Sequence, residues 1–336
     1  MITSLLVVLA IGIVAWIGAS IGLASLFGIV LPYAAVIIFI AGVVCRMVYW
    51  SKSPVPFCIP TTGGQQQSLE WIKAATLDNP STKWGVVKRM FLEVFFFRSL
   101  FRNTRADVRQ DGPSIVYFSS KWLWFFALLF HYCFLLVFIR HFRFFCDPVP
   151  ACLTFFEAVD GVLQIGAPRM YLTGVLLLCA LLFLLGRRMF DQRLRYLSLI
   201  NDYFPLFLLL GLVCSGIMLR YFAKTDIASV KVFTMGLVTL HPTIPDGVSA
   251  FFYVHLAFLS VLLMYFPFSK LMHMTGVFFS PTRNMPNNSR AVRHVNPWND
   301  PNAPYTTYAE YEDNFREAMA EAGLPLEKQP NQAGKE

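Results

Sequence analysis

Residues 250–273 read AFFYVHLAFLSVLLMYFPFSKLMH, and this stretch decides the fold class. About 20 mostly apolar residues are needed for an α-helix to cross the hydrocarbon core of a bilayer. The stretch supplies them with no acidic residue and one lysine close to its end. It also carries His255 and His273, and ionisable groups in or beside a membrane span are costly and usually functional. The stretch therefore predicts a transmembrane helix with a histidine toward each end.

The rest of the chain repeats this apolar character. The protein is 56% hydrophobic and only 14% charged, whereas a soluble protein carries roughly a quarter charged residues. Long continuous runs favour helices over the alternating strands of a barrel. The sequence therefore predicts an all-α, polytopic membrane helical bundle of about six transmembrane helices. The expected spans are residues 3–24, 28–49, 118–140, 169–187, 203–222 and 250–270.

Changes in composition divide the chain. The first span lacks a basic leader and a cleavage site, so it is expected to stay as a helix. Residues 88–98 mix basic and large apolar side chains, which is typical of an interfacial helix or of a helix packed on a partner. We expect an extra N-terminal helix over 1–27, the main helical bundle over 28–280 with a cytoplasmic insertion at about 51–116, and a polar cytoplasmic tail over 281–336 that contains a short helix at 308–322.

Charge gives the orientation. Of the 28 lysines and arginines, 22 border one side of the expected bundle and six the other. Positive residues gather on the cytoplasmic side, so both termini are expected in the cytoplasm and the protein in the bacterial cytoplasmic (inner) membrane. The basic residues border apolar spans, which argues against nucleic acid as a partner. Among the seven cysteines there is no CxxC pair, so c-type haem and an iron–sulfur cluster are not expected; a disulfide between Cys146 and Cys152 stays open.

Four histidines lie in or beside the spans: His131, His141, His255 and His273. A continuous helix places His255 and His273, 18 residues apart, on one face after five turns, roughly 27 Å from each other. His131 and His141, ten residues apart, are separated by a rise of roughly 15 Å. A single histidine in a span is more often a packing residue or a proton relay.

Antiparallel arrangement of the two spans pairs the histidines. His131 then meets His273 toward the inner face, and His141 meets His255 toward the outer face. Two stacked bis-histidine sites predict two b haems inside the bundle, with iron bound by all four side chains. Arg140 and Arg143 are candidate partners of the haem propionates, as are Arg46 and Lys121, although interfacial snorkelling explains any one of them equally well.

Three segments resemble the membrane cytochrome b subunit, or gamma subunit, of respiratory nitrate reductases. Residues 265–273 (YFPFSKLMH) are similar to the end of that family's last ligand helix, residues 186–195 (GRRMFDQRLR) to a loop, and residues 31–33 (LPY) to the start of its first helix. The resemblance covers about residues 30–275. It implies that His255 and His273 each bind one haem, and that the spacing of His131 and His141 fits the other ligand helix.

The extra first span, the long insertion and the polar tail depart from that pattern. With them, the chain is most similar to the membrane cytochrome b of the complex associated with dissimilatory sulfite reduction. This resemblance implies sulfate respiration and menaquinol or menaquinone as substrate. It also implies partners: a cytoplasmic iron–sulfur subunit resembling heterodisulfide reductase, a periplasmic multihaem cytochrome c, a periplasmic ferredoxin-like subunit and a second membrane subunit.

The expected function is electron exchange between menaquinol and the cytoplasmic iron–sulfur subunit. The loop at 143–169 has no lysine where the family has one near the quinol, so Glu157 or Asp160 is a candidate proton acceptor and Arg169 a candidate positive charge. Whether the chain counts as the quinol-oxidising or quinone-reducing subunit stays open. The competing functions are a haem-free transporter or proton channel that uses the histidines as relays, and a structural anchor.

Overall fold

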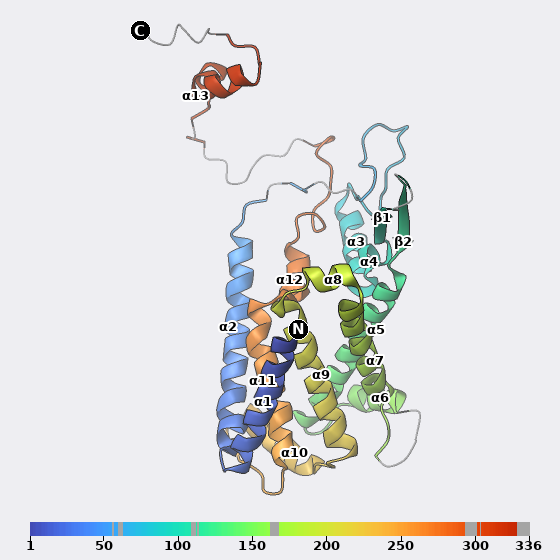
Figure 1. Cartoon of the computed structure of the whole chain (residues 1–336), viewed down its shortest axis with the longest axis vertical. Helices are drawn as coiled ribbons and strands as arrows, with labels where there is room; N and C mark the ends of the chain where they lie inside the picture. The colour runs from blue at the N-terminus through green and yellow to red at the C-terminus, as the bar shows by residue number, and fades with distance from the viewer. Residues whose placement is uncertain are drawn as a thin grey trace. The chain divides into compact units, whose positions relative to one another are not determined.

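A computed structural model describes residues 1–55, 57–59, 63–108, 112, 114–161, 168–292, 301–302 and 304–327. The chain forms two compact units, Met1–Arg290 and Ala291–Glu336, and each is described by itself. The first unit is mostly helical (Figure 1). The histidine of the polar tail, His294, lies outside the described residues.

Six helices among the described residues are long and apolar enough to cross a membrane, which confirms the expected number. They are α1 (Ile2–Ser20), α2 (Leu31–Ser51, preceded by a π-helical turn at Leu26–Val30), α5 (Lys121–His141), α7 (Leu172–Phe190), α9 (Ile200–Tyr221) and α11 (Ala250–Tyr265). A helix rises about 1.5 Å per residue, so spans of 19 to 26 residues, counting the short turns that extend α2, α5 and α11, are long enough for a hydrocarbon core of about 30 Å.

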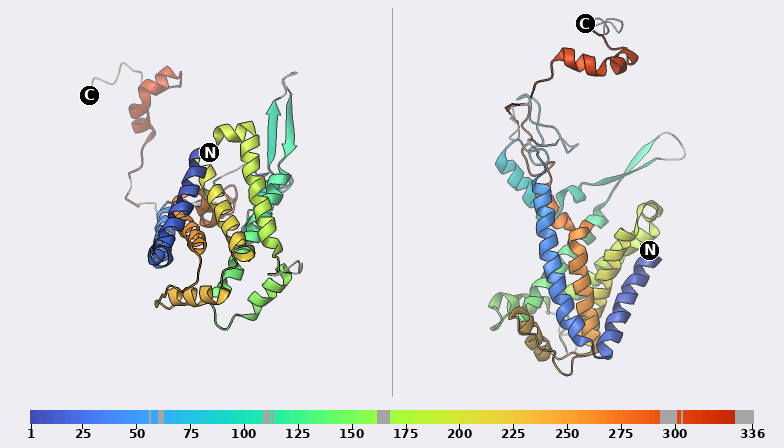
Figure 2. Two further views of the ribbon diagram at one scale, coloured as in Figure 1. Left: turned by 60° about the horizontal axis from the view of Figure 1, so that its bottom comes forward. Right: turned by 90° about the vertical axis from the view of Figure 1, so that its left-hand side faces the viewer.

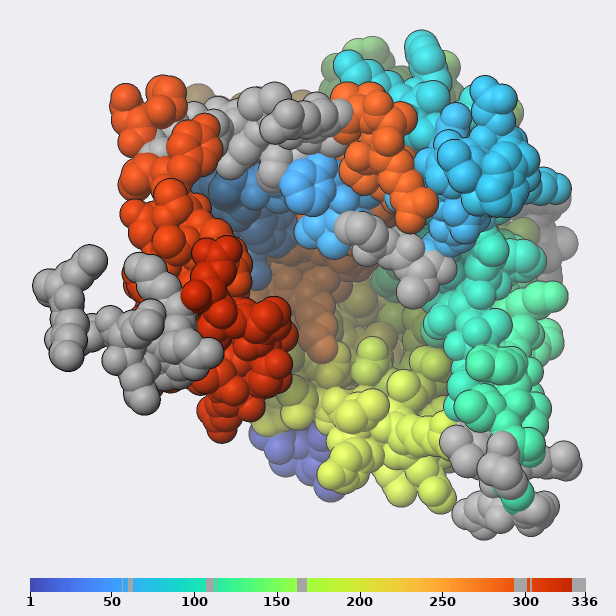
Figure 3. All heavy atoms as spheres, turned by 90° about the horizontal axis from the view of Figure 1, so that it is seen from above, coloured from blue at the N-terminus to red at the C-terminus, as the bar shows by residue number. Residues whose placement is uncertain are grey.

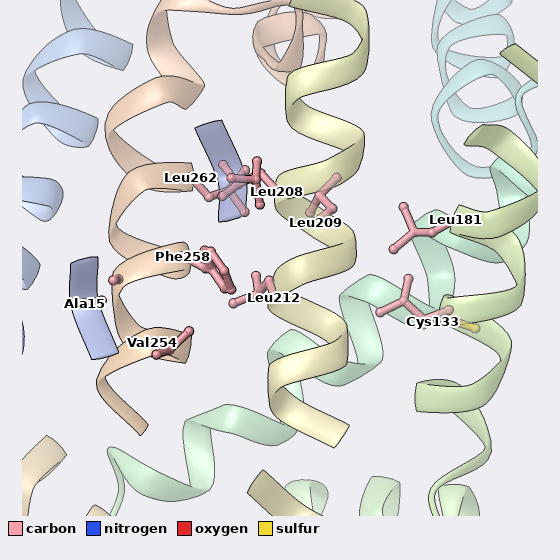
Figure 4. Close-up of a cluster of buried hydrophobic side chains, with 12 residues drawn as sticks. Ala15, Cys133, Leu181, Leu208, Leu209, Leu212, Val254, Phe258 and Leu262 are labelled. Atoms are coloured by element: carbon pink, nitrogen blue, oxygen red, sulfur yellow. The ribbon is translucent and has the colours of Figure 1, made fainter. Parts of the chain in front are cut away.

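Helix α11 lies at the centre of the bundle and packs against α1, α2 and α9. Its Phe258 and Leu262 meet Leu208 and Leu212 of α9 in the buried core (Figure 4). An added Cβ at Gly12 of α1 or at Gly211 of α9 comes within 3.1 Å of the Phe258 ring, so two glycines admit this side chain. Close packing through small residues is usual between membrane helices. Helix α1 therefore completes the core.

The sixth span is interrupted, contrary to the expectation of one continuous helix to His273. Helix α11 ends at Tyr265, a 3-10 turn covers Phe266–Phe268, and Ser269 is extended with φ −118° and ψ 177°. Proline has no N–H to donate and its ring clashes with the carbonyl four residues earlier in a regular helix, so Pro267 explains why the α-helix does not continue. A second 3-10 turn, Lys270–Met272, leads into α12 (His273–Gly276).

The third span begins later than expected, because residues 115–119 form a strand. Strands β1 (Thr104–Val108) and β2 (Ile115–Ser119) make an antiparallel hairpin, so the described structure is mostly helical and not purely so. The hairpin projects from one end of the bundle (Figure 2). Before it come α3 (Lys83–Phe96) and α4 (Arg98–Phe101), joined at Phe97, whose φ of 50° is left-handed. The expected helix around 88–98 is thus present, two residues shorter at its end.

Helix α3 exposes an apolar stripe. Trp84, Val87, Phe91 and Phe95 lie on one face and are all exposed, whereas Val86 and Arg89 on the opposite face are buried. The end of α3 is fixed to α5, because Trp124 Nε1 donates to the Phe96 carbonyl at 2.7 Å. The choice between an interfacial helix and a partner-bound helix stays a prediction.

Residues 57–59 and 63–103 fold together with residues 280–290 at the same end of the bundle. The Ile59 N–H donates to the Pro281 carbonyl at 3.2 Å, and the Asn287 N–H donates to the Pro80 carbonyl at 2.8 Å. Asn287 is buried and its side chain donates to Asn79 at 2.8 Å. The first ten residues of the expected tail are therefore packed against the insertion. Figure 3 shows this end hollowed between the blue insertion and the yellow-green helix α8 (Gln192–Leu197).

Helices α6 (Ala151–Asp160) and α10 (Ile227–Val238) lie at the opposite end of the bundle from α12 (Figure 1). In the second unit, α13 (Tyr308–Glu321) matches the short helix expected in the tail. Its first turn has a capping box, in which the Thr307 hydroxyl accepts from the Glu310 N–H and the Glu310 carboxylate accepts from the Thr307 N–H.

Candidate functional site: two histidine pairs

His131 and His273 lie beside each other although 142 residues separate them in the chain. His131 is in the middle of α5 and His273 is the first residue of α12. Their ring centroids are 5.9 Å apart and the ring planes make an angle of 81°. Because the sixth span is broken, the expected continuous helix of five turns from His255 to His273 is not present. The 3-10 turns after Pro267 bring His273 to His131 by a different route.

His141 and His255 occupy the α10 end of the same two spans. His141 is the last residue of α5, and His255 lies in the second turn of α11. The structure therefore places all four histidines along α5 and the sixth span, with one pair toward each end. His241 lies exposed in the loop before α11 and belongs to neither pair.

The four imidazoles share one hydrogen-bonding pattern, in which Nδ1 is bound by the protein. His131 Nδ1 lies 2.7 Å from the Ala127 carbonyl oxygen, and His141 Nδ1 lies 2.6 Å from that of Val137. His273 Nδ1 lies 2.9 Å from the Lys270 carbonyl oxygen. A carbonyl can only accept, so Nδ1 carries the proton in these three rings and Nε2 presents its lone pair.

His255 follows the same pattern through a hydroxyl group. Its Nδ1 lies 2.8 Å from Ser215 Oγ, and Ser215 Oγ lies 2.9 Å from the Leu212 carbonyl oxygen. A metal-binding histidine usually donates its other ring N–H in this way, which fixes the ring and the tautomer. All four rings thus have the chemistry of Nε2 metal ligands.

The distance between the first two rings suits a shared metal ion. Two imidazoles that share one metal ion, each through a bond near the 2.0 Å found at zinc, would have ring centres no more than roughly 6 Å apart. The observed 5.9 Å between His131 and His273 agrees with this spacing. In the described chain His131 and His255 are half-buried, whereas His141 and His273 are exposed. Each pair therefore has one half-buried and one exposed imidazole. The residues present therefore fit a bis-histidine haem.

Two of the four predicted propionate partners are engaged with carboxylates, and the other two lie over aromatic rings. Arg140 is 8% exposed and binds Asp160 at 3.0 Å, while its guanidinium stacks 3.8 Å from the centre of the Tyr171 ring. Arg143 binds Glu157 at 2.8 Å and keeps 34% of its side chain exposed. Arg46 and Lys121 stack over Trp50 and Phe101. A role of these cations in holding propionates stays a prediction.

The candidate proton acceptors differ in their surroundings. Asp160 accepts the Thr173 N–H at 2.8 Å and the Thr173 hydroxyl at 2.6 Å, in addition to its bond with Arg140. Glu157 is bound through Oε1 to Arg143. The backbone carbonyl of Arg169 accepts from Arg220 at 3.0 Å. Asp160 is therefore built into the packing of α6 against α7, and Glu157 is the less constrained carboxylate. Cys146 and Cys152 are free thiols.

Three contacts were not expected from the sequence. Ser215 binds His255 from α9, Phe97 places its ring edge-on to His131 with centroids 4.9 Å apart, and Lys270 binds Asp202 of α9 at 2.7 Å. Ser215 and Asp202 are polar residues within or beside an apolar span, and that anomaly was a usable signal. Phe97 gave no such signal, since only the fold brings it to the histidine.

Together, the six spans and the histidine pairs define a multi-pass helical membrane protein. The model of the family described as the nitrate reductase gamma subunit matches residues 81–293, more than half of the chain. The chain belongs to this family, as the resemblance of residues 186–195 and 265–273 indicated.

Two archaeal relatives are similar over most of their length. One, from Archaeoglobus fulgidus, is 47% identical over 286 residues, which are 83% of this chain and 85% of the relative. The other, from Archaeoglobus profundus, is 43% identical over 279 residues, 81% of this chain and 82% of the relative. Both are named Hdr-like menaquinol oxidoreductase cytochrome b-like subunit.

Proposed function

We propose that the chain is a dihaem membrane cytochrome b subunit that exchanges electrons between menaquinol and a cytoplasmic iron–sulfur subunit. His131 and His273 hold one haem b, and His141 and His255 hold the other. The observation that carries this proposal is the approach of two histidines from different spans: the ring centroids of His131 and His273 lie 5.9 Å apart, and Nδ1 of each ring is bound by a main-chain carbonyl. A bis-histidine haem supplies one-electron transfer and has no open position for substrate.

The protein's own groups position the four ligands. The carbonyls of Ala127, Val137 and Lys270 and the hydroxyl of Ser215 hold the Nδ1 protons, so each ring is turned before it meets iron. Placing these ligands on helices restricts their motion. Such preorganisation keeps the coordination unchanged between oxidation states, which suits electron transfer better than catalysis at the metal.

Menaquinol is oxidised at the α10 end, beside His141. Glu157 takes a proton from the quinol there, and Arg143, its partner at 2.8 Å, compensates the charge of the carboxylate. Support comes from the names of both Archaeoglobus relatives, which specify a menaquinol oxidoreductase. Sequence identity of 47% over most of this chain and of the A. fulgidus relative makes the same substrate the best assignment.

The α12 end faces the cytoplasm and the iron–sulfur partner. The excess of lysines and arginines in the insertion, the α7–α8 connection and the tail supports this orientation. The partners we assign are a cytoplasmic subunit resembling heterodisulfide reductase, a periplasmic multihaem cytochrome c, a periplasmic ferredoxin-like subunit and a second membrane subunit. The complex serves dissimilatory sulfite reduction in the cytoplasmic membrane.

The decisive experiment is the haem content of the purified chain. We expect two b haems per chain and a reduced-minus-oxidised spectrum of low-spin bis-histidine type. Copurification of the cytoplasmic partner tests the assembly separately. An intact, folded protein with fewer than one haem per chain overturns the proposal and favours a haem-free transporter or proton channel.

A further inference from the structure

His255 is held differently from the other three histidines. His131, His141 and His273 bind main-chain carbonyls of their own segments, three or four residues earlier in the chain. His255 binds a side chain, Ser215, that belongs to another helix and lies 40 residues away. Ser215 is 3% exposed. Its hydroxyl therefore belongs to a buried contact between α9 and α11.

The direction of this hydrogen bond follows from counting protons. Ser215 Oγ contacts the Leu212 carbonyl at 2.9 Å and His255 Nδ1 at 2.8 Å. A hydroxyl has one proton, and the carbonyl can only accept, so the proton points to Leu212. The oxygen then accepts from His255 Nδ1–H. Leu212 thereby orients the hydroxyl, and the hydroxyl selects the tautomer in which Nε2 is the ligand atom.

Gly216 limits the rotation of the same ring. A Cβ added at Gly216 comes 3.2 Å from His255 Cε1 and 3.7 Å from Nδ1. The contact at 3.2 Å is tighter than most real Cβ contacts, so a larger residue at position 216 displaces the imidazole or the helix. The ring of His255 is therefore seated against the backbone of α9 on one side and hydrogen-bonded to Ser215 through Nδ1.

We propose that Ser215 and Gly216 are positioning residues that set the redox potential of the haem bound by His141 and His255. The inference rests on the proposed function, because it needs a haem at that pair. A hydrogen bond that accepts the Nδ1 proton raises the basicity of the ligand atom. A more basic ligand stabilises oxidised iron, so Ser215 lowers the potential of this haem. The pair therefore has a tuning contact that can be removed without touching a ligand.

Ser215→Ala is the main test, measured by redox titration of the absorption spectrum. The two haems are resolved by the component that disappears in His255→Ala. We expect both haems to be retained and the His141–His255 component to rise in potential, so that its oxidised-to-reduced ratio at a fixed ambient potential falls at least threefold. The His131–His273 component stays unchanged. Ser215→Thr keeps the hydroxyl and restores the parent potential.

Ser260→Ala is the matched control. Ser260 is also a buried serine, 2% exposed, on α11 itself, but its hydroxyl donates to the Leu256 carbonyl at 2.8 Å and not to a histidine. We expect no change in either potential. Gly216→Ala is a second, independent variant that shifts the same component by displacing the ring. Gly174→Ala is its control, because an added Cβ at Gly174 has no neighbour within 4 Å.

Each outcome has one meaning. Two haems in the parent with an unchanged potential in both Ser215→Ala and Gly216→Ala overturn the tuning role and leave the proposed function standing. Equal shifts of both haems, or the same shift in Ser260→Ala, also overturn it, because they indicate a general loosening of the bundle. Fewer than one haem in the parent overturns the proposed function itself and this inference with it.

Discussion

The two histidine pairs use the same two spans and yet are supported in different ways. His131 and His273 take both of their Nδ1 acceptors from the main chain, at Ala127 and Lys270. The other pair takes one acceptor from the main chain, at Val137, and one from the side chain of Ser215. Main-chain acceptors survive substitution of the residue that carries them, whereas a side-chain acceptor does not. One site is therefore fixed by the fold, and the other is open to adjustment by single residues.

The surroundings of the two histidine pairs also differ. His273 stands after a break in the helix, next to the packed insertion, and Phe97 covers His131. His255 stands within helix α11 in the core. Near its partner His141, two ion pairs, Arg140–Asp160 and Arg143–Glu157, join the end of the third span to α6. Four predictions test this contrast, taken from the largest expected effect to the smallest.

The largest effect is the paired loss of haem. His131→Ala and His273→Ala are each expected to remove the same haem, and His141→Ala and His255→Ala the other. Removing one of two ligands leaves iron with a single imidazole, which does not hold a b haem in a buried bis-histidine site. Haem per chain and the spectrum of each variant provide the measurement.

His241→Ala is the control for these variants, because His241 is exposed and its Nδ1 bonds to the nearby Thr239 carbonyl. It is expected to keep both haems. Loss of the same haem in His131→Ala and His141→Ala contradicts the assignment of the pairs.

The second effect is on quinol oxidation and concerns the α10 end alone. Glu157→Gln removes the proposed proton acceptor and is expected to slow menaquinol oxidation by about 10²-fold or more, the usual contribution of a general base. Both haems remain and are still reduced by dithionite. Stopped-flow reduction of the haems by a menaquinol analogue gives the rate.

Asp160→Asn is informative beside it. Asp160 is 6% exposed and pairs with Arg140, so the substitution leaves a buried charge and costs about 3–5 kcal/mol of stability. We expect a lower thermal unfolding temperature with a normal rate per folded molecule. A normal rate in Glu157→Gln removes that residue from the proposed mechanism.

Much of this arrangement was predictable from the sequence, for identifiable reasons. Apolar runs and the placement of charges predict spans well because the bilayer imposes one strong constraint on each segment. Histidines stand out for the same reason. The break at Pro267 was visible as a residue type, yet its consequence for His273 depends on how the following turns pack. The strands at 104–108 and 115–119 were not predicted, because the second strand adjoins an apolar span that was expected to begin at residue 118.

The second shell around the histidines was harder to foresee. Ser215 lies in the apolar sequence Leu212–Gly216, and no local sequence pattern indicates that it faces α11. Its role depends on the register between α9 and α11, which is set by Gly211 and Phe258 one turn away. Contacts of this kind arise from tertiary packing, so they follow from coordinates and not from the periodicity of a single segment.

The third effect compares one partly exposed ion pair at each end. Lys270 binds Asp202 at 2.7 Å beside His273; the Lys270 side chain is 74% exposed and that of Asp202 is 8% exposed. Without Lys270 the Asp202 carboxylate still accepts the Leu199 N–H and has Arg188 at 3.8 Å, so Lys270→Met is expected to destabilise by about 1 kcal/mol. The Lys270 carbonyl still accepts from His273, so the potential of the His131–His273 haem should hardly move.

Lys231→Met breaks the corresponding pair with Asp147, at 3.1 Å, near the other end. It is expected to be similarly mild and to leave both potentials unchanged. Thermal unfolding and redox titration measure the two variants. A large shift of the His131–His273 component in Lys270→Met contradicts the view that this site is fixed by main-chain acceptors.

The smallest effect is a pH dependence confined to the insertion. Burial opposes ionisation of Asp78, but hydrogen bonds and charge from Arg102 and Arg98 outweigh it, so the pKa of Asp78 lies below its ordinary value of 3.8. A carboxyl group whose pKa is lower in the folded state stabilises it fully above the unfolded pKa, and the contribution is lost as the pH falls through the folded pKa. The ion pairs that join Asp78 to Arg98 and Arg102 should therefore weaken only below about pH 3.8.

Hydrogen exchange of the α4 amides is expected to accelerate below that pH, and Asp78→Asn is expected to show the faster exchange already at neutral pH. Since Phe97, directly before α4, contacts His131, the spectrum of the His131–His273 haem should change with the exchange and that of the other haem should not; equal changes in both would show that acid loosens the bundle as a whole.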